Sequence, residues 1–253
     1  MKKILILIYA CIGVISIALA DTMNVTWYNI DSTVYDTTTC TVGGTLNLPT
    51  APTRYGYTFK GWIPYTSIEY IESTGSQWID TGVYLTDNSK IEITCNIPSA
   101  NGNHALYGAG NGSTATQGEI ALFWRTGVYD AVYPTGQNSS AYTSFGPVVT
   151  DAKHVITFSK YGCFVNDVSK INRTFYNGYV GTRSLTLFAV HRDSVGYFAA
   201  FKLYSAKIWD EDTLVRDFIP VLDSNGVACM YDKISNTFFY NNGTGDFIAG
   251  PAL

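Results

Sequence analysis

Residues 152–167 read Ala152-Lys-His-Val-Ile-Thr-Phe-Ser-Lys-Tyr-Gly-Cys-Phe-Val-Asn-Asp167, and this stretch decides the fold class. The segment 155–158 is β-branched and aromatic, which favours a strand, and Tyr161-Gly162 supplies a tight turn. A return strand starts at residue 163, and Asn166-Asp167 turns the chain again. The pattern predicts a β-hairpin within an all-β protein.

The segments on either side extend this sheet. Segment 184–190 is apolar on both faces, so we expect it to lie in the middle of a sheet. In segment 197–209 the apolar phase slips from odd to even positions, which predicts a bulge or cover on both faces. Since no apolar run after residue 20 repeats with the period of a helix, helices should be few. Further strands are predicted at 77–83, 89–97, 104–107, 119–124, 214–221, 227–231 and 236–240, and segment 128–144 is expected to be loop or edge.

The phrases "AKHVITFSKYGCFVND", "SLTLFAVHRD" and "FKLYSAKIW" together resemble the laminin-G or concanavalin A-like lectin pattern. Asn166-Asp167 stands where that family usually has Asn-Gly, and His154 matches its structural histidine. The resemblance spans roughly residues 68–253. It implies an antiparallel jelly-roll β-sandwich, which we place at residues 65–253.

Residues 43–62, "GGTLNLPTAPTRYGYTFKGW", resemble the internalin-type B-repeat of bacterial surface proteins. The resemblance implies a small β-grasp-like spacer unit, which we place at residues 21–64, with Trp62 expected in its core. The matching positions are Gly44, Leu48, Pro49, Pro52, Arg54, Gly56, Tyr57, Phe59, Gly61 and Trp62.

Residues 1–20 have the pattern of a secretory signal peptide. Lys2 and Lys3 precede an apolar run, and Ala18-Leu19-Ala20 forms a small-x-small cleavage site. Cleavage changes the net charge from −4 to about −6. We therefore expect an exported protein of the cell surface, medium or periplasm with no remaining membrane span; an uncleaved anchor is the alternative.

The composition excludes several classes of protein. Apolar residues make up 46% of the chain, which is ample for a core, so disorder is not expected. Charged residues make up only 14%, and lysines and arginines do not cluster, which argues against a nucleic-acid partner.

Four cysteines remain after cleavage: Cys40, Cys95, Cys163 and Cys229. Outside the cytoplasm they permit two disulfides in any of three connectivities. One pair with a loose thiol, or buried inert thiols throughout, are the alternatives. No C-x-x-C spacing indicates a zinc or redox site.

The sequence predicts no enzyme. A glycosidase needs two carboxylates facing a sugar, and the Glu-x-Asp-x-x-Glu run of laminarinase-type enzymes is absent. Glu69 and Glu72 lie near a domain boundary, and Asp210-Glu-Asp212 forms a polar turn. His104, His154 and His191 have no nucleophile motif nearby.

No cofactor is expected to be required, and calcium is the expected metal if one is bound. The analogy with related sandwiches, which hold calcium in rim loops, implies carboxylate ligands. The candidate ligands are Asp80, Asp87, Asp130 and Asp193.

Sugar recognition would use aromatic rings together with short polar side chains. Such residues gather in and beside the Asn/Ser-rich segment 128–144. The candidates are Trp124, Arg125, Tyr129, Asp130, Tyr133, Asn138 and Tyr142. The function predicted is a binding or adhesion protein whose partner is a glycan or a cell-surface protein. A structural or protein-interaction module without sugar binding is the alternative, and a glycoside hydrolase is a distant third.

Overall fold

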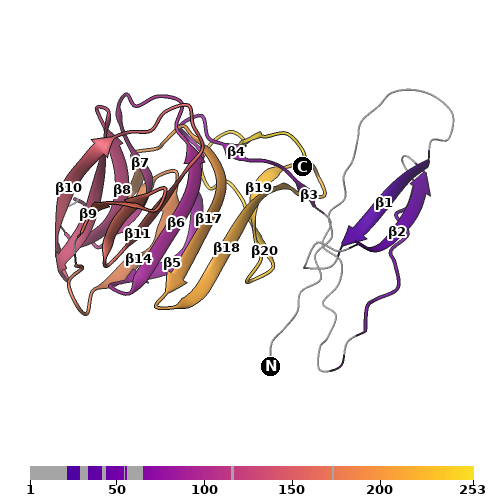
Figure 1. The fold of residues 1–253 in the computed structure, drawn as a ribbon, viewed down its shortest axis with the longest axis horizontal. Coiled ribbons are helices and arrows are strands. Elements are labelled where there is room, and N and C mark those ends of the chain that lie inside the picture. Colours follow the sequence, from indigo (N-terminus) through magenta and orange to yellow (C-terminus); the bar gives the residue numbers. More distant parts are fainter. Residues whose placement is uncertain are drawn as a thin grey trace.

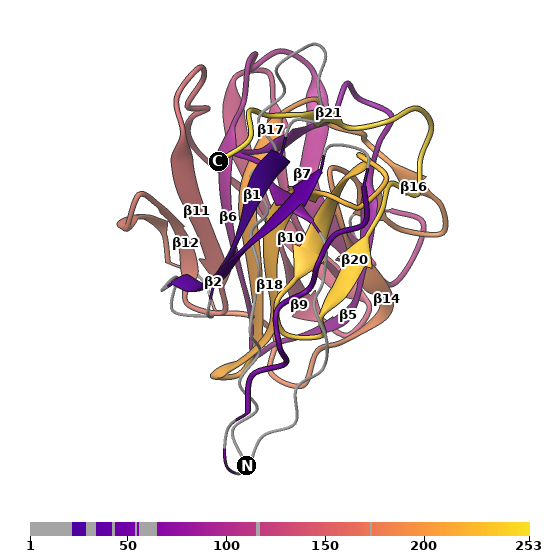
Figure 2. The ribbon, with the colours of Figure 1, turned by 90° about the vertical axis from the view of Figure 1, so that its right-hand side faces the viewer.

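The computed structural model describes residues 22–28, 34–41, 44–53, 55, 65–114, 117–172 and 174–253. All regular elements of this part are β-strands, and residues 65–253 build two facing sheets (Figures 1 and 2). This confirms the predicted all-β sandwich, and the arrangement is consistent with a jelly roll. Among the described residues, no helix is long and apolar enough to cross a membrane. The predicted leader, residues 1–20, lies outside the described residues.

The first sheet, called sheet I below, has the strand order β10-β9-β8-β7-β14-β5 with antiparallel neighbours. A short hairpin, β15–β16, attaches to it through a parallel bridge from β15 to β7. The strands are β5 (Ile79–Thr86), β7 (Asn103–Gly110), β8 (Glu119–Arg125), β9 (Val128–Gly136), β10 (Ser139–Pro147), β14 (Val180–Leu187), β15 (Val190–His191) and β16 (Val195–Gly196).

The second sheet, sheet II, has the order β13-β12-β11-β6-β17-β18-β19-β20. Three short strands attach to its central strands: β3 pairs with β18, β4 pairs with β17, and β21 pairs with β4. In Figure 2, β11 and β6 of sheet II lie at one side of the sandwich, and β14 and β5 of sheet I lie at the other. The strands are β3 (Thr66–Ser67), β4 (Ile71–Glu72), β6 (Ser89–Asn96), β11 (His154–Ser159), β12 (Gly162–Val165), β13 (Val168–Ile171), β17 (Lys202–Asp210), β18 (Thr213–Leu222), β19 (Ala228–Asp232), β20 (Thr237–Phe239) and β21 (Ile248–Ala249).

The core lies between the sheets because each central strand alternates in side-chain direction. On β6, Ile91, Ile93 and Cys95 are buried, as their alternation predicts, while the residues between them are half-exposed. Large aromatic side chains such as Phe158 and Trp124 fill the interior. Each buried ring of this size stabilises the fold by roughly 1.5–3 kcal/mol.

The hairpin predicted from residues 152–167 is present as β11 and β12, which pair from Ile156 with Val165 to Ser159 with Gly162. Asn166 and Asp167 both have positive φ, 48° and 62°, as the tight turn before β13 requires. Gly162 also has positive φ, and a side chain there would meet the Ile171 carbonyl oxygen. The predicted hairpin is therefore confirmed.

Two finer predictions concern single strands. The strand predicted at 184–190 is an inner strand only in part, because β14 ends at Leu187 between β7 and the edge strand β5, and Phe188 has a positive φ of 67° before β15 begins at Val190. The register of β17 against β6 shifts between Leu203 and Ser205, which is the bulge that the slip in apolar phase predicts.

Segment 128–144 is not a loop. It forms β9 and most of β10, and β9 lies between β8 and β10 within sheet I. Of these two strands, β10 is at an edge of sheet I, which agrees with the prediction that part of this segment is an edge strand. β9 is buried on both faces from Tyr129 to Pro134, so it lacks the alternation of polar and apolar residues that marks a half-exposed strand.

Near the N-terminus, β1 (Thr22–Tyr28) and β2 (Val34–Thr41) form a separate two-stranded antiparallel sheet (Figure 1). Val25 and Trp27 make its small core, and the Trp27 indole donates a 2.8 Å hydrogen bond to the Thr38 hydroxyl. The repeat unit at residues 21–64 stays a prediction, because its matching aromatic positions Tyr57, Phe59 and Trp62 lie outside the described residues.

Candidate functional site

Three of the predicted sugar-binding residues lie in the core. Trp124 is 2% exposed, Tyr129 is 1% exposed and Tyr133 is 9% exposed. All three sit on the inward faces of β8 and β9, where strand alternation directs them. A buried ring offers no face to a ligand, so the expectation that these residues line an exposed loop is wrong.

Three others come together on the outer face of sheet I. The Arg125 guanidinium lies 3.4 Å from a carboxylate oxygen of Asp130 and 5.5 Å from the ring centroid of Tyr142. The Ser144 hydroxyl donates to the same carboxylate group. The Asp130 carboxylate is therefore already engaged within the protein, while the Arg125 Nε makes an ion pair but no hydrogen bond in the described structure. Asn138 is exposed in the turn between β9 and β10.

The four candidate calcium ligands do not gather at one place. Asp130 is paired with Arg125, and Asp193 forms an ion pair with Arg183. The Asp80 carboxylate accepts a 2.9 Å hydrogen bond from the Gly82 amide, and Asp87 lies in the turn between β5 and β6. Within the described residues, no three His, Cys, Asp or Glu side chains form a group suited to a metal ion.

The four thiols are free, and they lie on β2, β6, β12 and β19. Cys95, Cys163 and Cys229 are buried. Burial raises the pKa of Cys163 and of Cys229 to about 12, so both are protonated at neutral pH. These three buried thiols agree with the alternative of inert cysteines, and no disulfide forms among the four candidate cysteines.

His154 belongs to a buried polar network. Its Nδ1 lies 2.9 Å from the Ala152 carbonyl oxygen, which only accepts, so Nδ1 carries the proton of the neutral ring. Nε2 then accepts a 2.7 Å hydrogen bond from the Tyr129 hydroxyl. Burial lowers the pKa of His154, with the hydrogen bond to Ala152 opposing this shift. Every ring atom that could act as a base is engaged, which fits a structural histidine.

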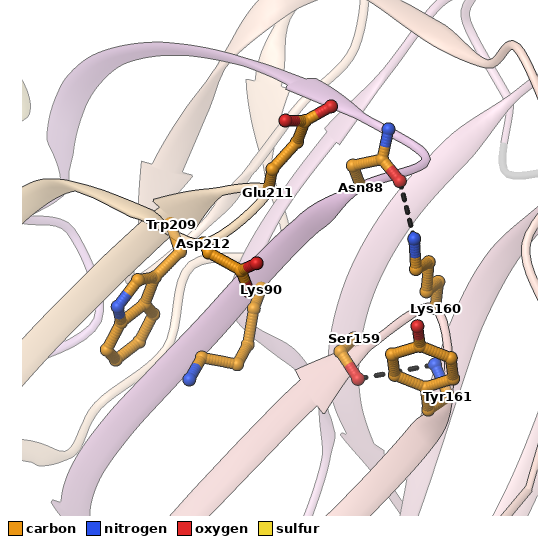
Figure 3. A pocket seen from close by; sticks show the side chains of 8 residues that line it. All are labelled: Asn88, Lys90, Ser159, Lys160, Tyr161, Trp209, Glu211 and Asp212. Carbon is orange, nitrogen blue, oxygen red and sulfur yellow. Dashed lines mark hydrogen bonds between the residues drawn. The ribbon is translucent and has the colours of Figure 1, made fainter.

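A pocket of about 510 Å³ opens at one end of sheet II, where three turns meet (Figure 3). We call it the Trp209 pocket. The turns are those between β5 and β6, between β11 and β12, and between β17 and β18. Its lining residues are Asn88, Lys90, Ser159, Lys160, Tyr161, Trp209, Glu211 and Asp212.

Two aromatic side chains stand on opposite sides of this pocket, as Figure 3 shows. Trp209 is half-exposed near the end of β17, and Tyr161 is 67% exposed in the β11–β12 turn. The Lys90 ammonium lies 3.6 Å from the centroid of the Trp209 ring, a cation–π contact that follows from cross-strand pairing of the two residues. Both aromatic side chains therefore present ring surface to solvent.

The polar groups of the Trp209 pocket offer donors and acceptors side by side. The Lys160 ammonium donates a 2.6 Å hydrogen bond to the Asn88 amide oxygen, which fixes both side chains. Glu211 and Asp212 are exposed in the β17–β18 turn. Ammonium groups only donate hydrogen bonds and carboxylates only accept them. A ligand rich in hydroxyl groups, each of which does both, suits this arrangement.

The sequence contained a weak signal for this pocket. The run Trp209-Asp-Glu-Asp-Thr213 places a large aromatic residue at a strand end beside an acidic turn, and Lys160-Tyr161 places another in a hairpin turn. The sequence alone does not show that these two aromatic residues are neighbours. Residues 88–90, 159–161 and 209–212 come together only because of the order of strands in sheet II.

Comparison with known proteins gives little help. No protein-family model matches the chain, and no curated protein matches it significantly. Among solved structures that match is a Bacteroides ovatus protein named "putative carbohydrate binding protein", with 11% identity and a TM-score of 0.48. The alignment covers 93% of this chain and 71% of that one. This likeness is too distant to carry an argument about function.

Proposed function

We propose that this chain is a carbohydrate-binding protein whose sugar ligand enters the Trp209 pocket. The supporting observation is the pair of exposed rings, Trp209 and Tyr161, on opposite sides of a space lined by lysines, an amide and carboxylates. Aromatic rings cover the C–H faces of a sugar at low entropic cost, and the polar groups read its hydroxyls.

In this proposal residues 65–253 are a lectin-like module of the concanavalin A or laminin-G type, and residues 21–64 are a spacer repeat. The protein is exported and acts in adhesion or glycan capture outside the cytoplasm. These assignments depend on the resemblances in the sequence.

The proposed role is binding without bond cleavage and without a required metal. Glu211 and Asp212 are neighbours on one exposed turn, whereas a glycosidase places its two carboxylates on either side of the scissile bond. Hydrolysis is tested by incubating purified protein with an oligosaccharide that it binds and measuring the release of reducing ends. Measurable release would contradict this part of the proposal.

A glycan array followed by calorimetry tests the main proposal. We expect one or more glycans to bind, and Trp209→Ala to weaken their affinity by about 2 kcal/mol, or ~30-fold, as for a central aromatic residue of an interface. Tyr84→Ala is the matched control, because Tyr84 is 60% exposed on β5 of sheet I, and it should bind like the unaltered protein.

Absence of binding to any glycan, with a stable complex to another protein, would favour the interaction module. Loss of affinity in Tyr142→Ala with none in Trp209→Ala would move the site to the Arg125–Asp130 cluster on sheet I.

A further inference from the structure

A second pocket, of about 280 Å³, lies on the same outer face of sheet II, towards its other end. We call it the Tyr204 pocket. The Lys153 ammonium lies over the Tyr204 ring, 4.3 Å from the ring centroid. Ser67 also lines this pocket, and its hydroxyl is buried with no hydrogen-bond partner in the described structure. Its lining residues are Ser67, Ile68, Glu69, Thr94, Lys153, Tyr204, Ser205, Ile219, Pro220 and Leu253.

A strip of half-exposed polar side chains connects the two pockets. On β6, Lys90 belongs to the Trp209 pocket and Thr94 to the Tyr204 pocket, with Glu92 between them on the same face. On β17, Lys207 lies beside Glu92, because the two residues are cross-strand partners. The strip therefore follows the strands without interruption from one pocket to the other.

The lysines on this face share an unusual environment. Four of them lie over aromatic rings: Lys90 over Trp209, Lys153 over Tyr204, Lys160 over Tyr161 and Lys202 over Tyr70. None of these four forms an ion pair with a carboxylate in the described part of the chain. Each described arginine, in contrast, has a carboxylate partner. Hydrogen-bond donors are thus held against ring surfaces along the strip.

The distance between the pockets indicates the size of the ligand. Trp209 and Ser205 are four residues apart on β17, so the pockets are separated by ~13 Å along the strand. This is longer than one sugar ring. A linear chain of several sugars can contact both aromatic platforms at once.

The charges indicate the chemistry of that ligand. The lysines alternate with the carboxylates of Glu69, Glu92, Glu211 and Asp212 over the same surface. An anionic polymer would meet these carboxylates along its whole length. A neutral chain of hydroxylated rings has no such conflict and uses both the donors and the acceptors.

We propose that sheet II binds a linear, neutral polysaccharide that runs along β17 and β6 and occupies the Trp209 and Tyr204 pockets together. This inference rests on the proposed carbohydrate-binding function and adds the length, course and charge of the ligand.

Calorimetry with neutral cello-, laminari- and manno-oligosaccharides, from the disaccharide to the hexasaccharide, tests it, with oligogalacturonates as the anionic series. We expect the affinity for one neutral series to rise about tenfold with length, because the second contact becomes intramolecular. Tyr204→Ala should remove this gain and leave the binding of the disaccharide unchanged, whereas Trp209→Ala should weaken both. Thermal unfolding checks that each variant is folded. If Tyr204→Ala does not fold, Lys153→Ala, an exposed position, replaces it and should reduce the gain.

The outcomes separate the two proposals. Binding that depends on Trp209 but not on length or Tyr204 would overturn the two-pocket inference and leave the proposed function standing. Tighter binding of oligogalacturonates than of every neutral series would overturn the assignment of a neutral ligand. No binding of any oligosaccharide, here and on the array, would overturn both.

Discussion

The outer faces of the two sheets handle charge in opposite ways. On sheet I the β15–β16 hairpin and its neighbouring residues cover a second apolar cluster around Phe123, and the charged groups are arginines paired with carboxylates. Arg192 and Glu119, for example, form two hydrogen bonds, of 2.6 and 3.1 Å, and are almost fully buried. On sheet II four lysines lie over aromatic rings without carboxylate partners, for example Lys90 over Trp209, although Lys233 and Arg216 are paired there with Asp217 and Asp232.

This difference distinguishes charged side chains that stabilise the fold from charged side chains that a ligand can contact. A buried bidentate pair satisfies both partners, and its geometry leaves little for a ligand to contact. An ammonium above an exposed ring keeps free donors and presents an apolar surface next to them. The buried arginine–carboxylate pair of sheet I therefore serves stability, and the lysine–aromatic contacts of sheet II are suited to recognition.

The largest expected effect concerns the buried pair on sheet I. Glu119→Ala leaves the Arg192 guanidinium buried without its partner, which should lower the free energy of unfolding by about 3–5 kcal/mol. Chemical denaturation measures this loss. Asp193→Ala is the matched control, because it removes the partner of Arg183 from an ion pair whose carboxylate is 59% exposed, and it should cost at most about 1 kcal/mol. Equal losses in the two variants would contradict the distinction between the pairs.

A smaller effect is expected in the core between the two faces. His154→Ala removes the acceptor of the buried Tyr129 hydroxyl and should cost about 1–3 kcal/mol. The pKa of His154 in the folded protein is lower than the value near 6.5 of the unfolded chain, so the unfolded state binds the proton first as the pH falls. Stability should therefore be complete above about pH 6.5 and decline below it, and His154→Ala should flatten that decline in denaturation curves recorded from pH 5 to 8. Tyr129→Phe, which keeps the histidine, should retain the pH dependence.

The fold was largely predictable because its signals are local. Alternation of Ile91, Ile93 and Cys95 specifies a strand with one buried face, and Asn166-Asp167 specifies a turn with positive φ. Even the bulge in β17 left a trace, since an inserted residue reverses the phase of the apolar pattern.

The site was not predictable in the same way. A tyrosine beside asparagines and serines has the same composition whether it faces the core, as Tyr129 does, or solvent, as Tyr142 does. Its direction depends on the register of β9 and β10, which the polar residues of segment 128–144 conceal. The Trp209 pocket depends in addition on which strands are neighbours, and strand order is a property of the whole chain.

The next prediction tests the lysine–aromatic contacts directly. Lys90→Gln removes the cation above Trp209 and keeps a polar group of similar length. We expect sugar affinity to fall by about 0.5–1 kcal/mol, the usual size of a cation–π contact at an exposed site, with little change in stability. Arg125→Gln removes a cation near Tyr142 on sheet I and should leave affinity unchanged. A larger effect of Arg125→Gln than of Lys90→Gln on calorimetric affinity would reverse the roles of the two faces.

The smallest expected effect is that of salt, and it is informative because it is small. Raising the ionic strength from about 0.1 to 1 M shortens the Debye length from ~10 to ~3 Å, which would weaken any binding that depends on attraction between unlike charges. The lysines and carboxylates of sheet II alternate, so a neutral sugar chain meets no net charge and gains its affinity from ring contacts and short hydrogen bonds. Calorimetric affinity should then change less than about twofold over this range. A steep loss of affinity with salt would mean that the lysine ammonium groups of sheet II attract an anionic ligand. The contrast between the two sheets would then lie only in which group neutralises the cation: a carboxylate of the protein on sheet I, or an anionic ligand on sheet II.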